Sequence, residues 1–139
     1  ILRWPGQLKP KADDTSLVSS IDLTPTILAA CSIRVPKAML GNNLLDVASG
    51  KAEPPKAAFG EIYEHDVADI SDAEPGLSFR WCIVGTWKLI LSKEEKNPEL
   101  YDLSIDATEK KNLAESQPER VKELTKRIED WWVRSSGAY

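Results

Sequence analysis

The sequence is poor in the residues from which many active sites are built. Its 139 residues contain one histidine, His65, together with two cysteines and one methionine. A single histidine excludes a metal site made of several histidines. The G-x-S-x-G motif of serine hydrolases, the phosphate-binding G-x-x-x-x-G-K-[ST] loop and the dinucleotide-binding G-x-G-x-x-G motif are also absent. The residues alone therefore show no complete active site.

Long apolar runs are absent as well. No stretch of 18 apolar residues occurs, so we expect no membrane-spanning helix. No basic stretch leads into an apolar one after Ile1, so we expect no signal peptide, and the missing initiator methionine suggests that something lies upstream. Cys31 and Cys82 form no C-x-x-C pair. We expect them to be small buried side chains, with a disulfide and a reactive thiol as the alternatives.

What is present is ordinary for one globular domain or for a piece of a larger one. Hydrophobic residues make up 42% and charged residues 29%, and the formal net charge of −4 argues against a nucleic-acid-binding surface. The five tryptophans either pack in the core, which we favour, or form exposed platforms for sugar rings. Acidic residues between Glu61 and Glu74 offer oxygen ligands to Ca²⁺ but lack the EF-hand order, so a solvated loop is the preferred interpretation.

Alternating apolar residues predict a β-hairpin in the second half of the chain. The alternation runs over 77–84, Gly85-Thr86 fits a two-residue turn, and 87–92 returns. Residues 57–63 and 99–103 predict two further strands. An amphipathic helix over 118–134 is predicted to cover the apolar face of the hairpin. Its apolar stripe is made of Val121, Leu124, Ile128 and Trp131.

The first half of the chain is less regular. Residues 1–6 predict a short strand that ends in a Pro-Gly turn, and a helix of about ten residues is expected to end near Ser32. Asp22 or Thr24 can cap that helix. Residues 34–56 are expected to be a long connection. A capping residue with glutamate three positions later, at Asp106–Glu109, predicts a single helical turn.

Six segments occur in the order in which the C-terminal part of the sulfatase family carries them. They are Ile1–Gly6, Val18–Leu28, Pro36–Leu45, Phe59–Glu61, Arg80–Ile90 and Glu99–Ala114. The last, Glu-Leu-Tyr-Asp-Leu-x-x-Asp-x-x-Glu-x-x-Asn-Leu-Ala in this sequence, is the most specific. Asn43 stands where serine is usual, Ala107 where proline is usual, and Ser32 where glycine is usual. Over its whole length, the chain resembles the C-terminal portion of an arylsulfatase-like member of the alkaline phosphatase superfamily.

The resemblance implies an α+β fold in two parts. Residues 1–50 would be the last strand and helix of a large sulfatase-type α/β domain, and residues 51–56 a linker. Residues 57–139 would form a small C-terminal subdomain, a four-stranded antiparallel sheet packed by a C-terminal helix. The upstream catalytic domain of the same parent chain is the partner that the resemblance implies.

The resemblance also implies an activity that this chain cannot perform alone. Sulfatases hydrolyse sulfate esters with a formylglycine, made from the Cys/Ser of a Cys/Ser-x-Pro-x-Arg motif, and with Ca²⁺. Cys31-Ser32-Ile33-Arg34 lacks the proline. Because the formylglycine motif and the metal ligands of the family would lie upstream of Ile1, we assign no catalytic residue, metal ligand or cofactor to this chain. A phosphonate monoester hydrolase or phosphodiesterase of the same superfamily and a stand-alone glycan-binding module remain the alternatives.

Two residues are candidates for the rim of a substrate cleft. His65 follows the first strand of the small subdomain, and its alternative is an exposed loop histidine. Arg80 lies in the hairpin, and its alternative is a salt-bridged arginine on the sheet. We also expect self-association through residues 1–16, because an unpaired apolar strand invites pairing. For the parent protein, the family favours a periplasmic, secreted or lysosomal location.

Overall fold

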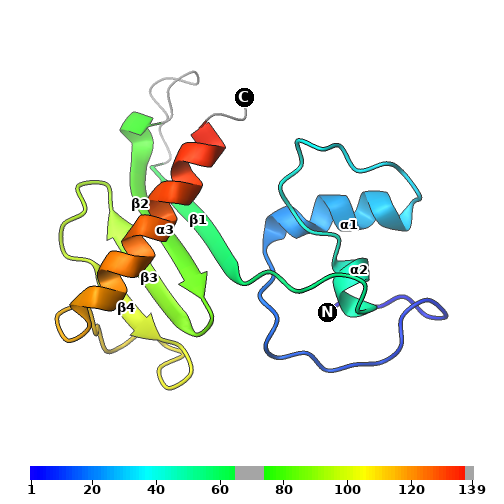
Figure 1. Cartoon of the computed structure of the whole chain (residues 1–139), viewed down its shortest axis with the longest axis horizontal. Helices are drawn as coiled ribbons and strands as arrows, with labels where there is room; N and C mark the ends of the chain where they lie inside the picture. Colours follow the sequence, from blue (N-terminus) through cyan, green and yellow to red (C-terminus); the bar gives the residue numbers. More distant parts are fainter. Residues whose placement is uncertain (65–73, 137–139) are drawn as a thin grey trace. The chain divides into compact units, whose positions relative to one another are not determined.

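A computed structural model gives the fold, and it describes residues 1–64 and 74–136. The chain separates into two compact units, Ile1–Lys56 and Ala57–Tyr139 (Figure 1). In the described residues, no helix has both the length and the apolar character that a membrane crossing requires.

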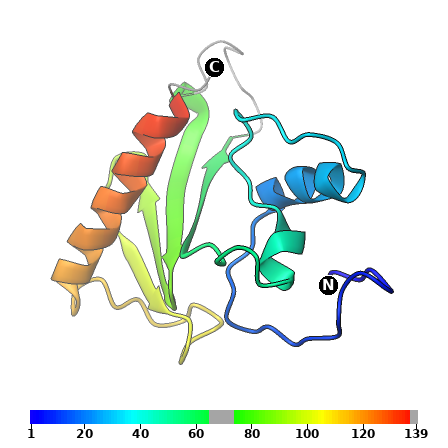
Figure 2. The ribbon, with the colours of Figure 1, turned by 45° about the vertical axis from the view of Figure 1, so that its right-hand side comes forward.

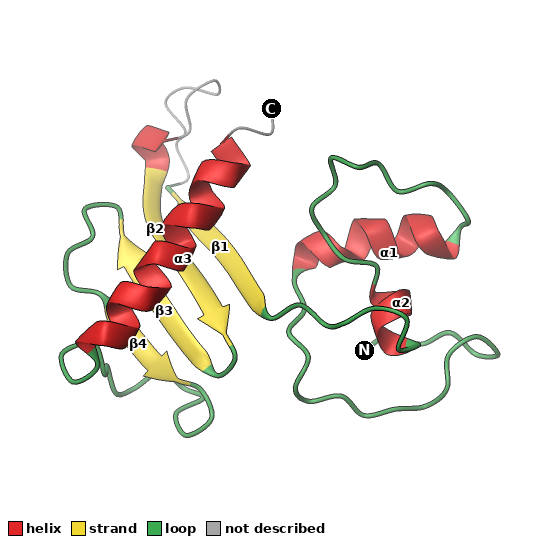
Figure 3. Ribbon diagram, in the orientation of Figure 1, coloured by secondary structure: helices red, strands yellow, loops and turns green. Residues whose placement is uncertain are grey.

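The second unit contains the predicted four-stranded sheet. The strands are β1 (Ala57–Tyr63), β2 (Leu77–Val84), β3 (Trp87–Ser92) and β4 (Glu99–Asp102), preceded at β2 by a 3₁₀ turn, η2 (Glu74–Gly76). They pair in the order β1-β2-β3-β4, and every neighbouring pair is antiparallel (Figure 3). This confirms the hairpin that alternation predicted and the four-stranded antiparallel sheet that the resemblance implied.

A tight turn joins β2 to β3, as the sequence predicts. Val84 pairs with Trp87, which leaves Gly85 and Thr86 as the two-residue loop. Gly85 has a φ of 59°, and Thr86 does not adopt a positive φ. A single glycine at the first loop position is the pattern of a type II′ turn, whose twist matches that of the flanking strands.

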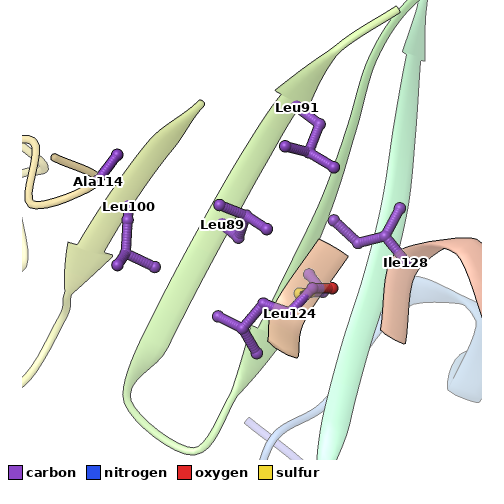
Figure 4. Close-up of a cluster of buried hydrophobic side chains, with 7 residues drawn as sticks. Leu89, Leu91, Leu100, Ala114, Leu124 and Ile128 are labelled. Carbon is purple, nitrogen blue, oxygen red and sulfur yellow. The ribbon is translucent and has the colours of Figure 1, made fainter. Parts of the chain in front are cut away.

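α3 (Pro118–Ser136) lies along one face of the sheet, and Figures 1 and 2 agree on this arrangement. Proline is tolerated in the first turn of a helix because the amide there has no partner within the helix. Between helix and sheet lies a cluster of fully or nearly fully buried side chains (Figure 4). Its members are Cys82, Leu89, Leu91, Leu100, Ala114, Leu124 and Ile128. Burial of each large aliphatic side chain contributes about 1.5–3 kcal/mol.

Aromatic contacts extend this core at both ends of α3. The rings of Phe59 and Trp131 stack with centroids 5.2 Å apart and an interplanar angle of 9°. Arg120 places its Cζ 5.0 Å from the ring centroid of Trp87. These contacts favour packing over a sugar platform for Trp87 and Trp131, whereas Trp4 is 37% exposed.

The first unit contains three short helices: η1 (Ser20–Asp22), α1 (Leu23–Ala30) and α2 (Leu44–Ala48). α1 ends where the chain turns at Ser32, whose φ is 59°. Ile33 N donates to Leu28 O at 2.8 Å across that turn. A residue in the left-handed region at this position closes many helices, and glycine reaches that region most easily. Serine therefore adopts the conformation for which glycine is usual.

Three local expectations are wrong. Residues 1–6 form no strand; a turn begins there instead, with the amides of Gln7 and Leu8 both donating to Trp4 O. The described residues of this unit contain no other strand to pair with, and an unpaired extended segment gains no ladder hydrogen bonds. α2 occupies part of the expected long connection. At Asp106–Glu109 the chain makes a turn rather than a helical turn, because Glu109 has a φ of 56°. Self-association through residues 1–16 stays a prediction.

Candidate functional site

Of the two candidate rim residues, Arg80 is the one that the structure describes. β2 holds it two positions from Cys82, on the face that α3 covers, and Arg80 is only 9% exposed. Its Nη2 donates to Glu95 Oε1 at 2.7 Å, and its Cζ lies 5.7 Å from the ring centroid of Trp132. The guanidinium thus joins β2, the β3–β4 loop and the C-terminal half of α3. Contact of Arg80 with substrate stays a prediction.

The hydrogen bonding of Arg80 is incomplete. Its Nε is buried and has no hydrogen-bond partner among the described residues. A guanidinium presents Nε and Nη2 along one edge, where it can hold two oxygens of an anion at once. Glu95 contacts Nη2 alone, its side chain is 44% exposed, and its backbone has a left-handed φ of 55°.

Glu61 lies directly opposite Arg80 in the antiparallel register of β1 and β2. Partial burial raises the pKa of the Glu61 carboxyl, and a side-chain hydrogen bond with Tyr63 acts in the opposite direction. The second candidate, His65, lies outside the described residues, so its role also stays a prediction. The structure therefore does not bring the two candidates together.

The described residues do not fit the catalytic equipment that the resemblance implies for the parent. Within residues 1–64 and 74–136, no group of three or more His, Cys, Asp or Glu side chains is placed to hold a metal ion. Cys82 is free and buried, and burial raises the pKa of its thiol to about 11. A thiol with so high a pKa supplies little thiolate at neutral pH. Cys31 is also free but exposed, contrary to the expectation of burial.

Asn112, in the motif Glu99–Ala114, ties β4 to the chain that follows it. Its Oδ1 accepts hydrogen bonds from the amides of Leu100 and Ala114, at 3.0 and 2.9 Å. Its Nδ2 donates to Pro98 O at 3.0 Å. Since Leu100 is completely buried, its amide depends on this one side chain.

The acidic residues of the same motif are also engaged. The Asp106 carboxylate accepts from the amides of Lys110 and Lys111, and these hydrogen bonds lower its pKa. The two Glu109 oxygens accept from Lys88 Nζ at 2.7 and 2.8 Å. Glu99 accepts from the Tyr101 hydroxyl. The most family-specific motif of the chain therefore builds turns and strand ends rather than a reactive centre.

A buried carboxylate organises the first unit. Asp22, only 1% exposed, accepts from the amides of Ser19 and Asn42 at 2.8 and 2.7 Å, and from Asn42 Nδ2 at 3.1 Å. Gly41 precedes this contact, and a Cβ there would collide with the carbonyl of Ile21. Asp22 therefore stands at the N-cap position of α1, as expected, but its side chain fastens the 36–43 loop to η1 and makes no capping hydrogen bond to α1.

Comparisons with known proteins give the family. Arylsulfatase K from Xenopus laevis is 28% identical to this chain, over 88% of this chain and 23% of its own length. An N-acetylgalactosamine-6-O-sulfatase from Bacteroides thetaiotaomicron is also 28% identical, over 93% of this chain and 26% of its own length. This chain spans about a quarter of the length of both.

Solved structures share the fold. A Bacteroides thetaiotaomicron structure from work on the metabolism of multiple glycosaminoglycans is 27% identical with a TM-score of 0.70, over 88% of this chain and 28% of that one. A phosphonate monoester hydrolase from Silicibacter pomeroyi is 22% identical with a TM-score of 0.74, over 95% of this chain and 28% of that one. The fold and the ordered motifs define the C-terminal region of a sulfatase. The chain belongs to the family described as N-sulphoglucosamine sulphohydrolase, C-terminal, whose model matches residues 1–134.

Sequence reasoning missed two polar contacts of this chain. Glu95 follows Arg80 by 15 residues across a hairpin, and no local signal marks the pair. Asp22 and Asn42 are 20 residues apart. Asp22 drew attention only as a possible helix cap, although its three-residue spacing from Ser19 predicts a local side-chain–backbone bond.

Proposed function

We propose that this chain is the C-terminal part of a sulfatase, a sulfuric ester hydrolase, and that the 139-residue chain alone has no activity. The observation that carries the proposal is the family match over residues 1–134, with the relatives named as sulfatases. Hydrolysis of a sulfate ester requires an activated nucleophile and electrostatic stabilisation of the sulfate oxygens. Among the described residues, no group of three or more His, Cys, Asp or Glu side chains could hold a metal ion beside such a nucleophile.

In this proposal, the small sheet and α3 complete the fold of a larger enzyme. The nucleophile, a formylglycine, and the ligands of Ca²⁺ would belong to an upstream catalytic domain of the same parent chain. The described residues contain no group of three or more side chains that could hold Ca²⁺, so the part of the reaction that needs Ca²⁺ would belong to that upstream domain.

The substrate class that we propose is a sulfated sugar. It is supported by one relative named an N-acetylgalactosamine-6-O-sulfatase and by a structural neighbour from work on glycosaminoglycan metabolism. The alternative activity, hydrolysis of phosphonate monoesters, is supported by the neighbour from Silicibacter pomeroyi. At 22% identity that likeness concerns the fold alone, so the sulfatase assignment is the stronger one.

The test uses both the isolated chain and the complete reading frame that encodes it. The pure 139-residue chain should release no 4-nitrocatechol from 4-nitrocatechol sulfate. The complete protein, carrying its matured nucleophile, should release sulfate from that compound and from a 6-O-sulfated N-acetylgalactosamine. Turnover by the isolated chain would disprove the inactivity proposal. A complete protein that cleaves a phenyl phosphonate monoester but no sulfate ester would favour the alternative.

A further inference from the structure

We propose that Arg80 is a binding residue for an oxyanion group of an acidic sugar. In the free chain the Glu95 carboxylate occupies part of this site, and the oxyanion displaces it. The sugar rests on the proposed function, but the oxyanion site rests on geometry alone. Arg80 is 9% exposed, and its buried Nε has no hydrogen-bond partner among the described residues. An orphaned charged donor of this kind costs free energy unless something satisfies it.

The shape of the guanidinium indicates what satisfies it. Sulfo and carboxylate groups can accept from Nε and Nη2 together, and such paired, charge-assisted bonds are among the strong ones in proteins. The Glu95 oxygen takes Nη2 alone at 2.7 Å. Among the described residues, the site therefore lacks one acceptor, which an oxyanion in the place of the Glu95 carboxylate could supply.

The internal partner is held weakly. The Glu95 side chain is 44% exposed, so water competes for its oxygens. Its backbone has a left-handed φ of 55°, and it lies in the β3–β4 loop rather than in a strand. By contrast, Arg80 is fixed by the sheet on which it lies and by the Trp132 ring, 5.7 Å from its Cζ. Displacement of the Glu95 carboxylate would thus move a half-exposed side chain and leave Arg80 in place.

The chain offers a matched control. Lys88 and Glu109 form a second part-buried ion pair, in which both carboxylate oxygens lie within 2.8 Å of Nζ. Glu109→Gln and Glu95→Gln each remove one negative charge, so the two variants have the same net charge. Lys88, however, has no guanidinium edge. Any gain in anion binding that comes from net charge alone will appear in both variants.

The experiment is a titration of the full 139-residue chain and its variants with sodium sulfate and with sodium acetate, against sodium chloride at equal ionic strength. Backbone and arginine Nε–H resonances report binding by NMR. Glu95→Gln should bind the oxyanion about tenfold more tightly than the wild type, with the Arg80 Nε–H resonance shifting on binding. Glu109→Gln should bind as the wild type does, and the double variant E95Q/R80K should lose the gain.

The outcomes separate the two proposals. The gain with sulfate or acetate supports the site, and the stronger of the two tells whether a sulfo or a carboxylate group is its source. The site is wrong if Glu95→Gln gains nothing with either anion, if Glu109→Gln gains equally, or if the Arg80 resonance stays still. Should the double variant not fold, the Arg80 resonance in Glu95→Gln decides. These titrations measure anion binding and not enzymatic activity. They therefore test the Arg80 site even if the complete protein proves not to be a sulfatase.

Discussion

Replacement of Asn112 by alanine tests the structural role of the Glu99–Ala114 motif. The substitution removes the acceptor for the amides of Leu100 and Ala114 and the donor to Pro98 O. The lost bonds to the Ala114 amide and to Pro98 O cost about 1 kcal/mol each, and leaving the Leu100 amide buried without a partner costs about 1 kcal/mol more, so the total destabilisation is about 3 kcal/mol. Leu100 is 0% exposed, so water does not readily replace the lost acceptor.

The assay is urea unfolding followed by tryptophan fluorescence. Four of the five tryptophans lie in the second unit, so the signal reports mainly the unit that contains Asn112. With a denaturant dependence of about 1.5 kcal/mol per molar urea, the midpoint should fall by about 2 M. Coincident transitions by fluorescence and far-ultraviolet circular dichroism would justify the two-state treatment of that unit.

Two controls make the reasoning falsifiable. Asn112→Asp keeps an acceptor for the Leu100 amide and loses only the donor, so it should cost about 1 kcal/mol. Ser104→Ala removes an exposed hydroxyl that bonds within its own turn, to Asp102, and should change stability by no more than about 0.5 kcal/mol. If Asn112→Ala shifts the midpoint no further than Asn112→Asp does, the buried Leu100 amide does not depend on this side chain and the argument is refuted.

Three further outcomes follow from the second unit and the thiols. Leu124→Ala, at a site 1% exposed, should cost about 2–5 kcal/mol by chemical unfolding, whereas Ile105→Ala, at a site 82% exposed, should cost under about 0.5; equal losses would contradict the assigned core. The Tyr101 hydroxyl donates to Glu99, which raises the pKa of Tyr101 to about 12. The stability that this bond contributes is present below pH 10 and is lost as the pH rises through about 12. Glu99→Gln should therefore lower the pKa of Tyr101, measured by ultraviolet titration of the phenol. One thiol, that of exposed Cys31, should react quickly with a disulfide reagent, and buried Cys82 only on unfolding; two fast thiols would exclude the buried position.

The sheet and α3 could be predicted because their signals are periodic and repeat over many residues. Alternation over Leu77–Val84 predicts the strand but not the face that α3 covers, because Cys82 and Arg80 are buried on that face whereas Phe79 is 38% exposed. The stripe of α3 has the helical period, and Leu124 and Ile128 are buried as that period requires. Residues 1–6 have strand composition but no partner strand in their unit, and no local pattern can supply one.

The candidate site was harder to predict because its contacts join residues that are distant in sequence. Arg80 could be named as a rim or salt-bridge residue from its place in the hairpin. Glu95 could not be named as its partner, because the contact depends on a left-handed turn at a residue other than glycine. Sequence rules assign that conformation chiefly to glycine and asparagine.

The Glu99–Ala114 motif shows why a family can be recognised in a segment that carries no chemistry. Its asparagine and its carboxylates are bound to backbone amides, to Lys88 and to a tyrosine hydroxyl. Such bonds require particular side-chain lengths at particular spacings, so the segment tolerates few alternatives whatever reaction the parent performs. The phosphonate monoester hydrolase from Silicibacter pomeroyi and the Bacteroides thetaiotaomicron structure both share the fold of this chain. The hydrogen bonds of the motif thus account for a fold and do not by themselves distinguish one reaction from another.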